Sequence, residues 1–507
     1  MHSEKKDYEK IKKISKKAAL LTSISELLDW DKETYMPSAG GEMRGEQLKL
    51  LAGMTHKQMT GKAFSKALSA LIDIETGELK ATSLPAPEKA ALRLWRRDYL
   101  RDIALPGKFV EDFTVLTTKA MEVWAEARKN NNFALFAPYL AKIIAMSQKK
   151  ADLLGYKEHP YDALLNLYEP DITKNEVAKL FSPLKNSIIQ LLQTISSKRQ
   201  LDNQFLSGNF SEEKQLAFGR MLLKDLGYDE RRGRLDVSTH PFSCTLHPDD
   251  NRITTRIEPD FVMSNILAVL HEFGHGLYEM GLPAEQFGTP LGEAVSLGMH
   301  ESQSRWWETR IGLSKPFWSR YLPHLQTYYP ENFSRISIEQ FYRGINKVTP
   351  SLIRVEADEV TYTLHIILRF ELEVALIEGS LSVKDLPERW NSGMKELLGI
   401  TPETDREGCL QDIHWAMGGF GYFPTYALGN MYASHFFENF EKNIPDWKNL
   451  VEKGDFGSIE TWLKDKIHRY GRQYTGRELM EKNSGKSFSE EAYLSYLHKK
   501  YSDIYKE

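Results

Sequence analysis

The segment with the clearest chemical meaning is His271-Glu272-Phe273-Gly274-His275, an H-E-x-x-H sequence. In a helix, two histidines four residues apart share one face and are separated by about 6 Å along the axis. Their ring nitrogens can then converge on one tetrahedral metal ion, and zinc is the usual occupant of this motif. Glu272 would flank the metal without binding it, so it could take a proton from a water that the metal activates.

The alternative is a chance occurrence of this pattern on a structural helix. Two observations argue against chance. The protein has only 14 histidines, and apolar residues surround the motif, which predicts a buried helix. Two buried histidines beside a buried glutamate would be costly without a metal to satisfy them. The sequence therefore favours a metal-dependent hydrolase.

A hydrolytic zinc site also needs a third protein ligand. The histidine found six residues downstream in some zinc proteases is absent, because position 281 is glycine. Glu279 continues the helix face of the two histidines, but it lies about 12 Å along the axis from His271 and cannot share one ion with it. The third ligand must therefore come from another segment.

Two glutamates, Glu293 and Glu301, remain as candidates for the third ligand. Both fall in residues 291–310, where the apolar pattern predicts a second helix that folds back after a turn at 281–283. Their offset of eight residues would place them on roughly the same helix face. Spacing alone leaves the choice between them open.

Six short motifs follow one another along the chain. They are His240-Pro241-Phe242, Asp250-Asn251-Arg252-Ile253-Thr254, the H-E-x-x-H segment, His300-Glu301-Ser302-Gln303, Ile353-Arg354-Val355-Glu356-Ala357-Asp358 and Gly408-Cys409-Leu410-Gln411-Asp412-Ile413-His414-Trp415. In this order they resemble the motifs HPF, DxRxT, HEFGH, HESQ, IRxxAD and GxxQDxHW of the thermostable metallocarboxypeptidase family typified by carboxypeptidase Taq. Residues 28–31 and 36–37 are also similar to this family, so the resemblance covers nearly the whole chain.

The resemblance implies a mainly α-helical fold with a deep substrate cleft and a small β-sheet, similar to helical zinc oligopeptidases. It implies a single catalytic domain over residues 1–507 and a homodimer. It also implies Zn²⁺, with Co²⁺ able to replace it, and the release of single C-terminal residues from peptides with broad specificity. By the HESQ motif, the third ligand is Glu301, and Glu293 has a structural role or supports a ligand.

An exopeptidase must recognise a free carboxylate, and the planar guanidinium group of arginine binds carboxylates through two parallel hydrogen bonds. Arg354 is the first candidate, since it lies in one of the motifs and precedes a strongly periodic helix. A salt bridge to a nearby acidic residue is its alternative role. Arg252 is the rival candidate, although a structural ion pair with Asp250 would also explain it.

The stretch 414–426 is rich in glycine and aromatic residues. Glycines let the backbone approach a ligand closely, and Tyr or His donors can stabilise a tetrahedral oxyanion. We expect His414 to bind substrate and Tyr422 or Tyr426 to donate to the oxyanion. Packing of the aromatic rings beneath a tight loop is the alternative.

Three further residues have weaker assignments. His240 is a further substrate-binding candidate, although it could equally hold a turn beside Pro241. A lone histidine is more often a satisfied structural group, and this applies to His300 too. Asp358 could orient a metal-bound imidazole, as carboxylates next to metal ligands do.

The leading hypothesis is a zinc carboxypeptidase that acts on peptides with a free C-terminus. Its closest alternative is an endo-acting or dipeptide-releasing zinc oligopeptidase on the same scaffold, which would not need an arginine for the terminal carboxylate. A catalytically silent peptide-binding protein is the third hypothesis. The intact Glu272 argues against it, because binding alone does not need a general base.

These groups must be positioned by helices, because helical periodicity dominates the 507 residues. The strongest predicted helices are 9–30, 89–100, 109–128, 174–192, 212–226 and 361–378. Two strands, 239–246 and 251–257, are predicted to form a hairpin around 247–250. No linker or internal repeat interrupts the pattern, so we expect one large helical body.

The composition excludes several classes of protein. A hydrophobic content of 41% is typical of a globular protein, and the net charge of −4 offers no basic excess for nucleic acid. Two cysteines exclude a disulfide framework or a cysteine-built zinc site. No run of 18 apolar residues occurs, and the charged start has no signal-peptide core, so a cytoplasmic location is expected.

Overall fold

The computed structural model describes residues 2–506, and helices dominate it. The α-helices are α1 (His2–Thr34), α2 (Gly41–Thr60), α3 (Lys62–Ser69), α4 (Ala86–Ala104), α5 (Gly107–Lys129), α6 (Phe133–Leu154), α7 (Pro160–Leu165), α8 (Lys174–Ser196), α9 (Glu212–Asp225), α10 (Val262–Gly281), α11 (Leu297–Arg305), α12 (Lys315–Tyr328), α13 (Pro330–Phe333), α14 (Ile338–Ile345), α15 (Tyr362–Glu378), α16 (Leu386–Leu398), α17 (Pro424–Asn443), α18 (Trp447–Lys453), α19 (Gly457–Lys466), α20 (Gly476–Ser484) and α21 (Glu491–Ile504).

Local chemistry explains where several of these helices begin and end. α8 begins after Thr173, whose side chain accepts from the Glu176 amide while the Glu176 carboxylate bonds back to the Thr173 amide. α15 ends at Gly379, which adopts φ +83°, a conformation that favours glycine. All six helices predicted from periodicity are present. Five of them begin and end within four residues of the expected positions, whereas α1 begins seven residues earlier and ends four residues later than the predicted 9–30. The mainly α-helical body with a small sheet is therefore confirmed.

The sheet has three strands, β1 (Gly233–Val237), β2 (Ser243–His247) and β3 (Asp250–Thr255), in the order β1-β3-β2. β2 and β3 form the predicted antiparallel hairpin. The sequence did not reveal β1, which pairs in parallel with β3. β1 is five residues long and contains a glycine and two charged residues, so its strand state depends on the partner rather than on local pattern.

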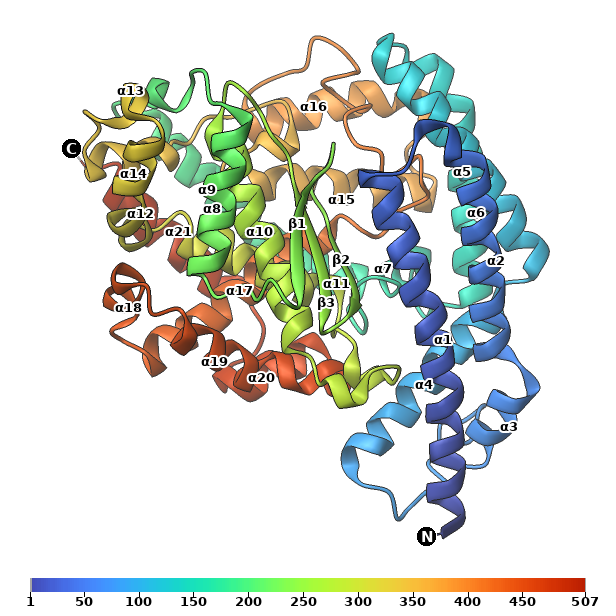
Figure 1. The fold of residues 1–507 in the computed structure, drawn as a ribbon. Helices are drawn as coiled ribbons and strands as arrows, with labels where there is room; N and C mark the ends of the chain where they lie inside the picture. The colour runs from blue at the N-terminus through green and yellow to red at the C-terminus, as the bar shows by residue number, and fades with distance from the viewer. Residues whose placement is uncertain (1, 507) are drawn as a thin grey trace.

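The sheet lies between α1 and α10, with β2 against α1 and β3 against α10 (Figure 1). A side-chain hydrogen bond from Asn265 Nδ2 to Thr255 Oγ1, 2.9 Å long, ties the start of α10 to the end of β3. Gly276 allows the close packing, because a β-carbon there would lie within 3.3 Å of the Ile253 side chain. The sheet thus fixes the helix that carries the H-E-x-x-H motif.

The helix predicted over residues 291–310 is wrong in its extent. Residues 290–292 form a 3₁₀ turn, Glu293 is extended, and α11 begins only after Ser296, whose hydroxyl accepts from the Met299 amide. After Arg305 the chain continues as a π-helical turn, η5 (Trp306–Ile311). The apolar pattern could not distinguish these states, because all of them bury residues at similar intervals.

Most of the buried apolar side chains form one large cluster that includes the inner faces of α8, α10, α12, α15 and α17. A second, smaller cluster is formed mainly by α1, α3 and α4, with Leu291 from the loop before α11. Leu291 therefore joins the N-terminal helices to the segment that leads into α11.

Both cysteines are buried, each with 4% of its surface exposed, and both are free thiols. Burial raises the pKa of Cys244 and Cys409 well above the usual range of a thiol. The Cys244 thiol donates to the carbonyl oxygen of Glu26 on α1 at 3.3 Å. Among residues 2–506, no helix is both long and apolar enough to cross a membrane.

Candidate metal-dependent active site

The side chains of His271, His275 and Glu301 meet where α10 packs against α11. The Nε2 atoms of the two histidines lie 3.6 and 3.7 Å from the same oxygen, Glu301 Oε2. One potential ligand atom from each of the three residues lies within 4.8 Å of the others. Two imidazole nitrogens and one carboxylate oxygen fit a divalent ion such as zinc, with a coordination position left for water or substrate.

Two glycines allow the three ligands to come this close. A β-carbon on Gly274 of α10 would lie 2.6 Å from Ser304 Cα on α11. A β-carbon on Gly429 of α17 would lie 2.7 Å from Glu301 Cβ. Both distances are below normal contact, so any side chain at these positions would displace α11 and the ligand it carries.

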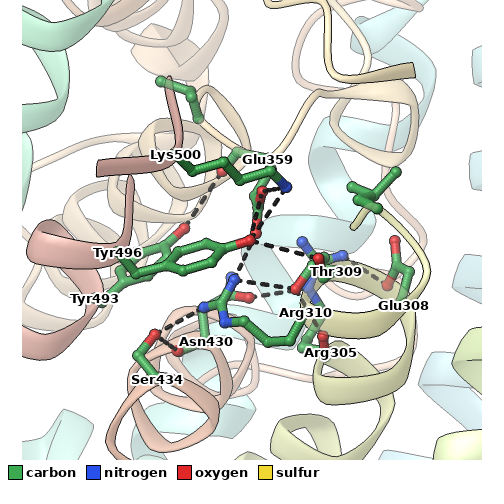
Figure 2. Close-up of polar contacts among 12 residues, drawn as sticks. Arg305, Glu308, Thr309, Arg310, Glu359, Asn430, Ser434, Tyr493, Tyr496 and Lys500 are labelled. Atoms are coloured by element: carbon green, nitrogen blue, oxygen red, sulfur yellow. Dashed lines mark hydrogen bonds and ion pairs between the residues drawn. The ribbon is translucent and has the colours of Figure 1, made fainter. Parts of the chain in front are cut away.

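A carboxylate holds the outer nitrogen of His271. His271 Nδ1 lies 2.8 Å from Glu308 Oε2 on η5. Arg305 Nη1 donates to the same oxygen at 2.7 Å, a contact drawn in Figure 2. Arg305 is fixed in turn by Asn430 of α17, which accepts from its Nε at 2.9 Å. A hydrogen bond from Nδ1 leaves the Nε2 lone pair free to face a metal.

The other side of η5 carries a buried network of charges. Arg310 donates to Glu359 at 2.6 Å and to Ser434 of α17 at 2.7 Å, and Lys500 of α21 donates to Glu359 at 2.7 Å (Figure 2). Burial alone would raise the pKa of Glu359, but Lys500 and Arg310 outweigh it and lower the pKa to about 2. The π-helical turn that presents Glu308 is therefore fixed from both sides.

The outer nitrogen of His275 has a different partner. His275 Nδ1 lies 2.6 Å from His300 Nδ1, and His300 Nε2 lies 2.9 Å from Glu279 Oε1. If His275 binds metal through Nε2, its Nδ1–H donates to His300, and the Nε2–H of His300 donates to Glu279. Glu279, excluded as a ligand by its spacing, thus supports a ligand through His300.

The two histidines also differ in charge before metal binds. Burial, followed by the nearby His300 and His271, lowers the pKa of His275 and keeps it neutral. Burial also lowers the pKa of His271, but Glu301 and Glu308 outweigh this and raise it to about 9. A metal ion must therefore displace a proton from His271 but not from His275.

Glu272, the middle residue of the H-E-x-x-H motif, is not one of the three residues of the potential metal cluster. It is buried, and its Oε2 atom has no hydrogen-bond partner within residues 2–506. Burial raises the pKa of its carboxyl group to about 7. A buried carboxylate with a free oxygen beside a metal site can exchange a proton with a reacting water.

Two alternatives from the sequence are not at the metal cluster. Glu293 forms a 2.6 Å ion pair with Arg472 and keeps 53% of its side chain exposed. Asp358 accepts from the amides of Thr349, Val360 and Thr361, so it organises the turn before α15. The hypothesis that Asp358 orients a metal-bound imidazole is therefore wrong, since Glu308 and His300 occupy those positions.

Arg354 is buried in a cluster of two arginines and one carboxylate. It lies on the 3₁₀ turn η6 (Arg354–Glu356), and its Nε and Nη2 atoms donate to Asp412 Oδ1 at 3.0 and 2.8 Å. Arg369 of α15 donates to the other oxygen of Asp412 at 2.7 Å. Burial alone would raise the pKa of Asp412, but the two guanidinium groups hold it well below its usual range.

Residues 408–423, which we call the glycine–aromatic loop, bring His414 and Tyr422 together with Tyr426 of α17. His414 Nε2 lies 3.2 Å from the Tyr426 hydroxyl, and the Tyr422 and Tyr426 rings are 5.4 Å apart. Burial, followed by the charge of Glu301 for Tyr422, raises the pKa of both tyrosines, so both hydroxyls stay protonated. Burial lowers the pKa of His414 to about 4, which keeps it neutral.

The remaining two sequence candidates lie on and beside the sheet. Arg252 of β3 forms a two-point ion pair with Asp250 at 2.9 and 3.1 Å, and its guanidinium group lies 4.4 Å from the centre of the Trp30 ring. His240 is exposed in the connection between β1 and β2, where its carbonyl accepts from the Ser238 hydroxyl. The contacts of these two residues join the sheet and α1 rather than the metal cluster.

Sequence reasoning did not identify Glu308, Glu279 or Asp412 as parts of the site. Asp412 lay inside a recognised motif, but nothing in the sequence indicated which arginines it would pair with. Glu308 follows Arg305 by three residues within an apolar stretch, and such a spaced ion pair was a usable signal. Its contact with His271 depends on the π-helical turn, which no local pattern predicts.

Comparison with known proteins gives a consistent result along the chain. The profile of the carboxypeptidase Taq (M32) metallopeptidase family matches residues 10–501. "Thermostable carboxypeptidase 1" of Thermus thermophilus is 40% identical, with 98% of this chain and 99% of that protein aligned. "Carboxypeptidase 1" of Bacillus subtilis is 38% identical over 99% of this chain and 98% of its own. The crystal structure of the M32 carboxypeptidase from Deinococcus radiodurans superposes with a TM-score of 0.95, at 34% identity and 99% coverage of both chains.

Proposed function

The chain belongs to the carboxypeptidase Taq (M32) metallopeptidase family, a family of peptide hydrolases, and on that premise we propose that it is a zinc-dependent carboxypeptidase. It releases single amino acids from the C-termini of peptides with broad specificity. The observation that carries this proposal is the convergence of His271, His275 and Glu301 beside the buried, unpaired carboxylate oxygen of Glu272.

The donor set supports zinc as the metal. Two imidazole nitrogens and one carboxylate oxygen form a ligand set found in hydrolytic zinc sites, and Co²⁺ accepts the same donors. When bound, the ion would supply a Lewis acid for the scissile carbonyl group and lower the pKa of a water molecule. His271 and His275 would hold the ion, while Glu308 and His300 fix the orientation of their rings.

Glu272 is the proposed general base. It accepts a proton from the attacking water and then delivers that proton to the nitrogen of the leaving amino acid. Its pKa of about 7 supports both steps, because a group that titrates near the working pH can accept and donate. Tyr422 and Tyr426 are the proposed donors to the carbonyl oxygen as negative charge develops there, with His414 binding the substrate beside them.

Charge balance supports Arg354 as the group that recognises the terminal carboxylate. Arg354 and Arg369 share the single carboxylate of Asp412, so the buried cluster carries one excess positive charge that a substrate carboxylate could balance. Arg252, by contrast, is already balanced one-to-one by Asp250. We therefore keep Arg354 as the first candidate, and place Arg252 and the exposed His240 behind it.

One assay tests the proposal against its closest alternative. A blocked dipeptide with a free C-terminal carboxylate and its C-terminal amide would be compared, each with chelator and with added Zn²⁺ or Co²⁺. A carboxypeptidase should cleave the free acid much faster than the amide and should lose activity to the chelator. Equal cleavage of both peptides would favour the endo-acting or dipeptide-releasing oligopeptidase.

Three further parts of the proposal rest on the family resemblance and on the amino-acid sequence. We propose that residues 1–507 form a single catalytic domain, that the protein is a homodimer, and that it works in the cytoplasm. Sedimentation equilibrium of the metal-loaded protein tests the second statement directly, since a mass near the 58.4 kDa of one chain would contradict it.

A further inference from the structure

Two glutamates outside the metal site are almost fully buried, Glu169 in the turn after α7 and Glu373 on α15, with 1% and 0% of their surface exposed. Their hydrogen-bond donors are hydroxyl, indole and backbone N–H groups rather than lysine or arginine. Burial raises the pKa of both carboxyl groups to about 7. A buried carboxylate without a bonded cation is costly, so its position calls for an explanation.

Glu169 binds the beginning of α11, the helix that carries Glu301. Its Oε2 accepts from the Gly298 amide at 3.0 Å, and its Oε1 accepts from the Tyr432 hydroxyl of α17 at 3.0 Å. The neighbouring Tyr168 carbonyl accepts from the Leu297 amide. The first amides of α11 are thus held by residues 168–169, and a carboxylate at this end of a helix is electrostatically favourable.

Glu373 binds the glycine–aromatic loop. Its Oε1 accepts from Trp415 Nε1 at 2.9 Å, and its Oε2 accepts from the Gly421 amide at 3.0 Å and from the Tyr161 hydroxyl at 2.7 Å. Gly421 adopts φ +91° and packs so tightly on α7 that a β-carbon would lie 2.7 Å from the backbone of Leu164. These contacts fix the loop on both sides of its glycines.

Residues 161–169 therefore contact both halves of the active site. Tyr161 and Leu164 contact the glycine–aromatic loop through Glu373 and Gly421, and Tyr168 and Glu169 bind the start of α11. The Tyr168 ring also packs edge-on against the Tyr422 ring, with centres 5.1 Å apart. One short segment thus sets the distance between the metal ligand on α11 and the proposed oxyanion donor.

We propose that Glu169 and Glu373 are positioning residues with divided roles. Glu169 fixes α11 and so sets the affinity for metal through Glu301. Glu373 fixes the glycine–aromatic loop and so sets turnover through His414 and Tyr422, a part that rests on the proposed function.

The partners of each carboxylate decide which substitution is tolerated. In Glu169→Gln, the amide oxygen can accept from Gly298 while the NH₂ group donates to the Tyr432 hydroxyl, which can also act as an acceptor. In Glu373→Gln, the NH₂ group must face either Trp415 Nε1–H or Gly421 N–H, and neither can accept. Glutamine should therefore preserve the hydrogen bonds of residue 169 but not those of residue 373.

The first measurement is metal affinity by chelator competition on the full-length protein. Glu169→Ala should raise the dissociation constant for Zn²⁺ by about tenfold or more, as expected for loss of a group that supports a ligand. Glu169→Gln should stay within about threefold of the wild type. Glu373→Gln should stay within about twofold. These results do not depend on the enzyme's activity, so they stand even if the proposed function fails.

The second measurement is turnover at saturating metal, together with amide hydrogen exchange of residues 414–422. Glu373→Gln should lower kcat by about tenfold or more with a smaller change in KM, and should speed exchange in the loop. Glu169→Ala should recover most of its kcat once metal is saturating. Glu460→Gln is the matched control, since burial also raises the pKa of Glu460 to about 7, but it lies beside Gly227.

Three outcomes would overturn the proposal. They are an unchanged metal affinity in Glu169→Ala, a loss of metal affinity in Glu373→Gln as large as in Glu169→Ala, and unchanged loop exchange in Glu373→Gln. If a variant does not fold, Tyr432→Phe or Tyr161→Phe removes one donor from Glu169 or Glu373 and keeps the carboxylate. Tyr432→Phe must then weaken metal binding without lowering kcat at saturating metal. Tyr161→Phe must lower kcat without weakening metal binding.

Discussion

The metal-binding side and the substrate-binding side of this site are built differently. The three metal ligands lie on two helices, and each histidine is held by a partner on a neighbouring helical segment. His414, Tyr422 and Arg354 lie on a loop and a 3₁₀ turn, and buried polar groups far away in the sequence hold them. Helices fix ligands through local geometry, whereas the loop depends on long-range contacts.

From this difference we expect the two sides to respond differently to substitutions. On the metal-binding side, removal of a ligand or of its close packing should abolish metal binding and activity. On the substrate-binding side, a single substitution should lower activity only in part, because several contacts together hold the loop in place. Four experiments, from the largest expected effect to the smallest, test this contrast.

Removal of a metal ligand should have the largest effect. His271→Ala and His275→Ala should lose bound metal and lower activity by at least about a thousandfold, because several kcal/mol of charge stabilisation are lost. Glu301→Ala should weaken metal binding far more than Glu293→Ala, since Glu293 pairs with Arg472 instead. Metal analysis after gel filtration measures this, and full metal content in either histidine variant would contradict the assigned site.

Removal of the general base should leave the metal-binding side intact. Glu272→Gln should keep its metal and its melting temperature but lower kcat by about a hundredfold or more, since an amide cannot accept the proton of the attacking water. Metal content and steady-state kinetics on the same sample check this. A kcat near that of the wild type would remove Glu272 from the mechanism.

Removal of the recognition arginine should have a partial effect. Arg354→Ala should lower kcat/KM for free-acid peptides by about 10- to 100-fold, the loss expected for a charged hydrogen bond, with the metal content unchanged. Arg354→Lys should restore part of the loss, and the amidated peptide should lose little more.

Arg252→Ala is the matched control for this experiment, because its balanced ion pair with Asp250 offers no excess charge. Its kcat/KM should change by about twofold or less. If selectivity for the free acid survives in Arg354→Ala but disappears in Arg252→Ala, the carboxylate is bound at the sheet and the assignment must be reversed.

The pH dependence of stability should differ in sign between two buried carboxylates, Glu359 behind η5 and Glu373 behind the glycine–aromatic loop. Glu359, behind η5, has its pKa lowered to about 2, so the stability it contributes is present above pH 4.5 and is lost as the pH falls toward 2. Glu373 has its pKa raised to about 7, so the folded state binds its proton more tightly and stability is lost as the pH rises from 4.5 to 7.

The free energy of unfolding, measured by chemical denaturation across these pH ranges, tests both directions of change. Glu359→Gln should remove the first dependence and Glu373→Gln the second, each worth at most about 3 kcal/mol. Parallel profiles for the two variants would contradict the opposite pKa shifts assigned to Glu359 and Glu373.

The sequence predicted the helical side of the site better than the loop side, for a physical reason. Helical period placed His271 and His275 on one helix face, with Glu272 beside them, without further information. It also predicted one continuous helix over 291–310, because apolar spacing cannot separate α11, the extended residues before it and the π-helical turn after it. The choice of Glu301 over Glu293 came from the family resemblance, and the start of α11 at Leu297 explains it.

The partners on the loop side could not be predicted in the same way. Asp412 pairs with Arg354 and Arg369, which lie 58 and 43 residues away in the sequence. Residue types alone offered several acidic partners for Arg354, and only tertiary packing selects one. The same holds for β1, which is a strand only because β3 lies beside it.

The burial of both natural thiols has a practical consequence for experiments on this protein. A thiol reacts with maleimides or iodoacetamide only as an exposed thiolate, and Cys244 and Cys409 are neither exposed nor easily ionised. A cysteine introduced at an exposed position, such as Val115 on α5 or Met43 on α2, should therefore be labelled alone in the natural background. Fluorophores or spin labels attached there could report the distance between α2 and α5 during substrate binding without removal of the native cysteines.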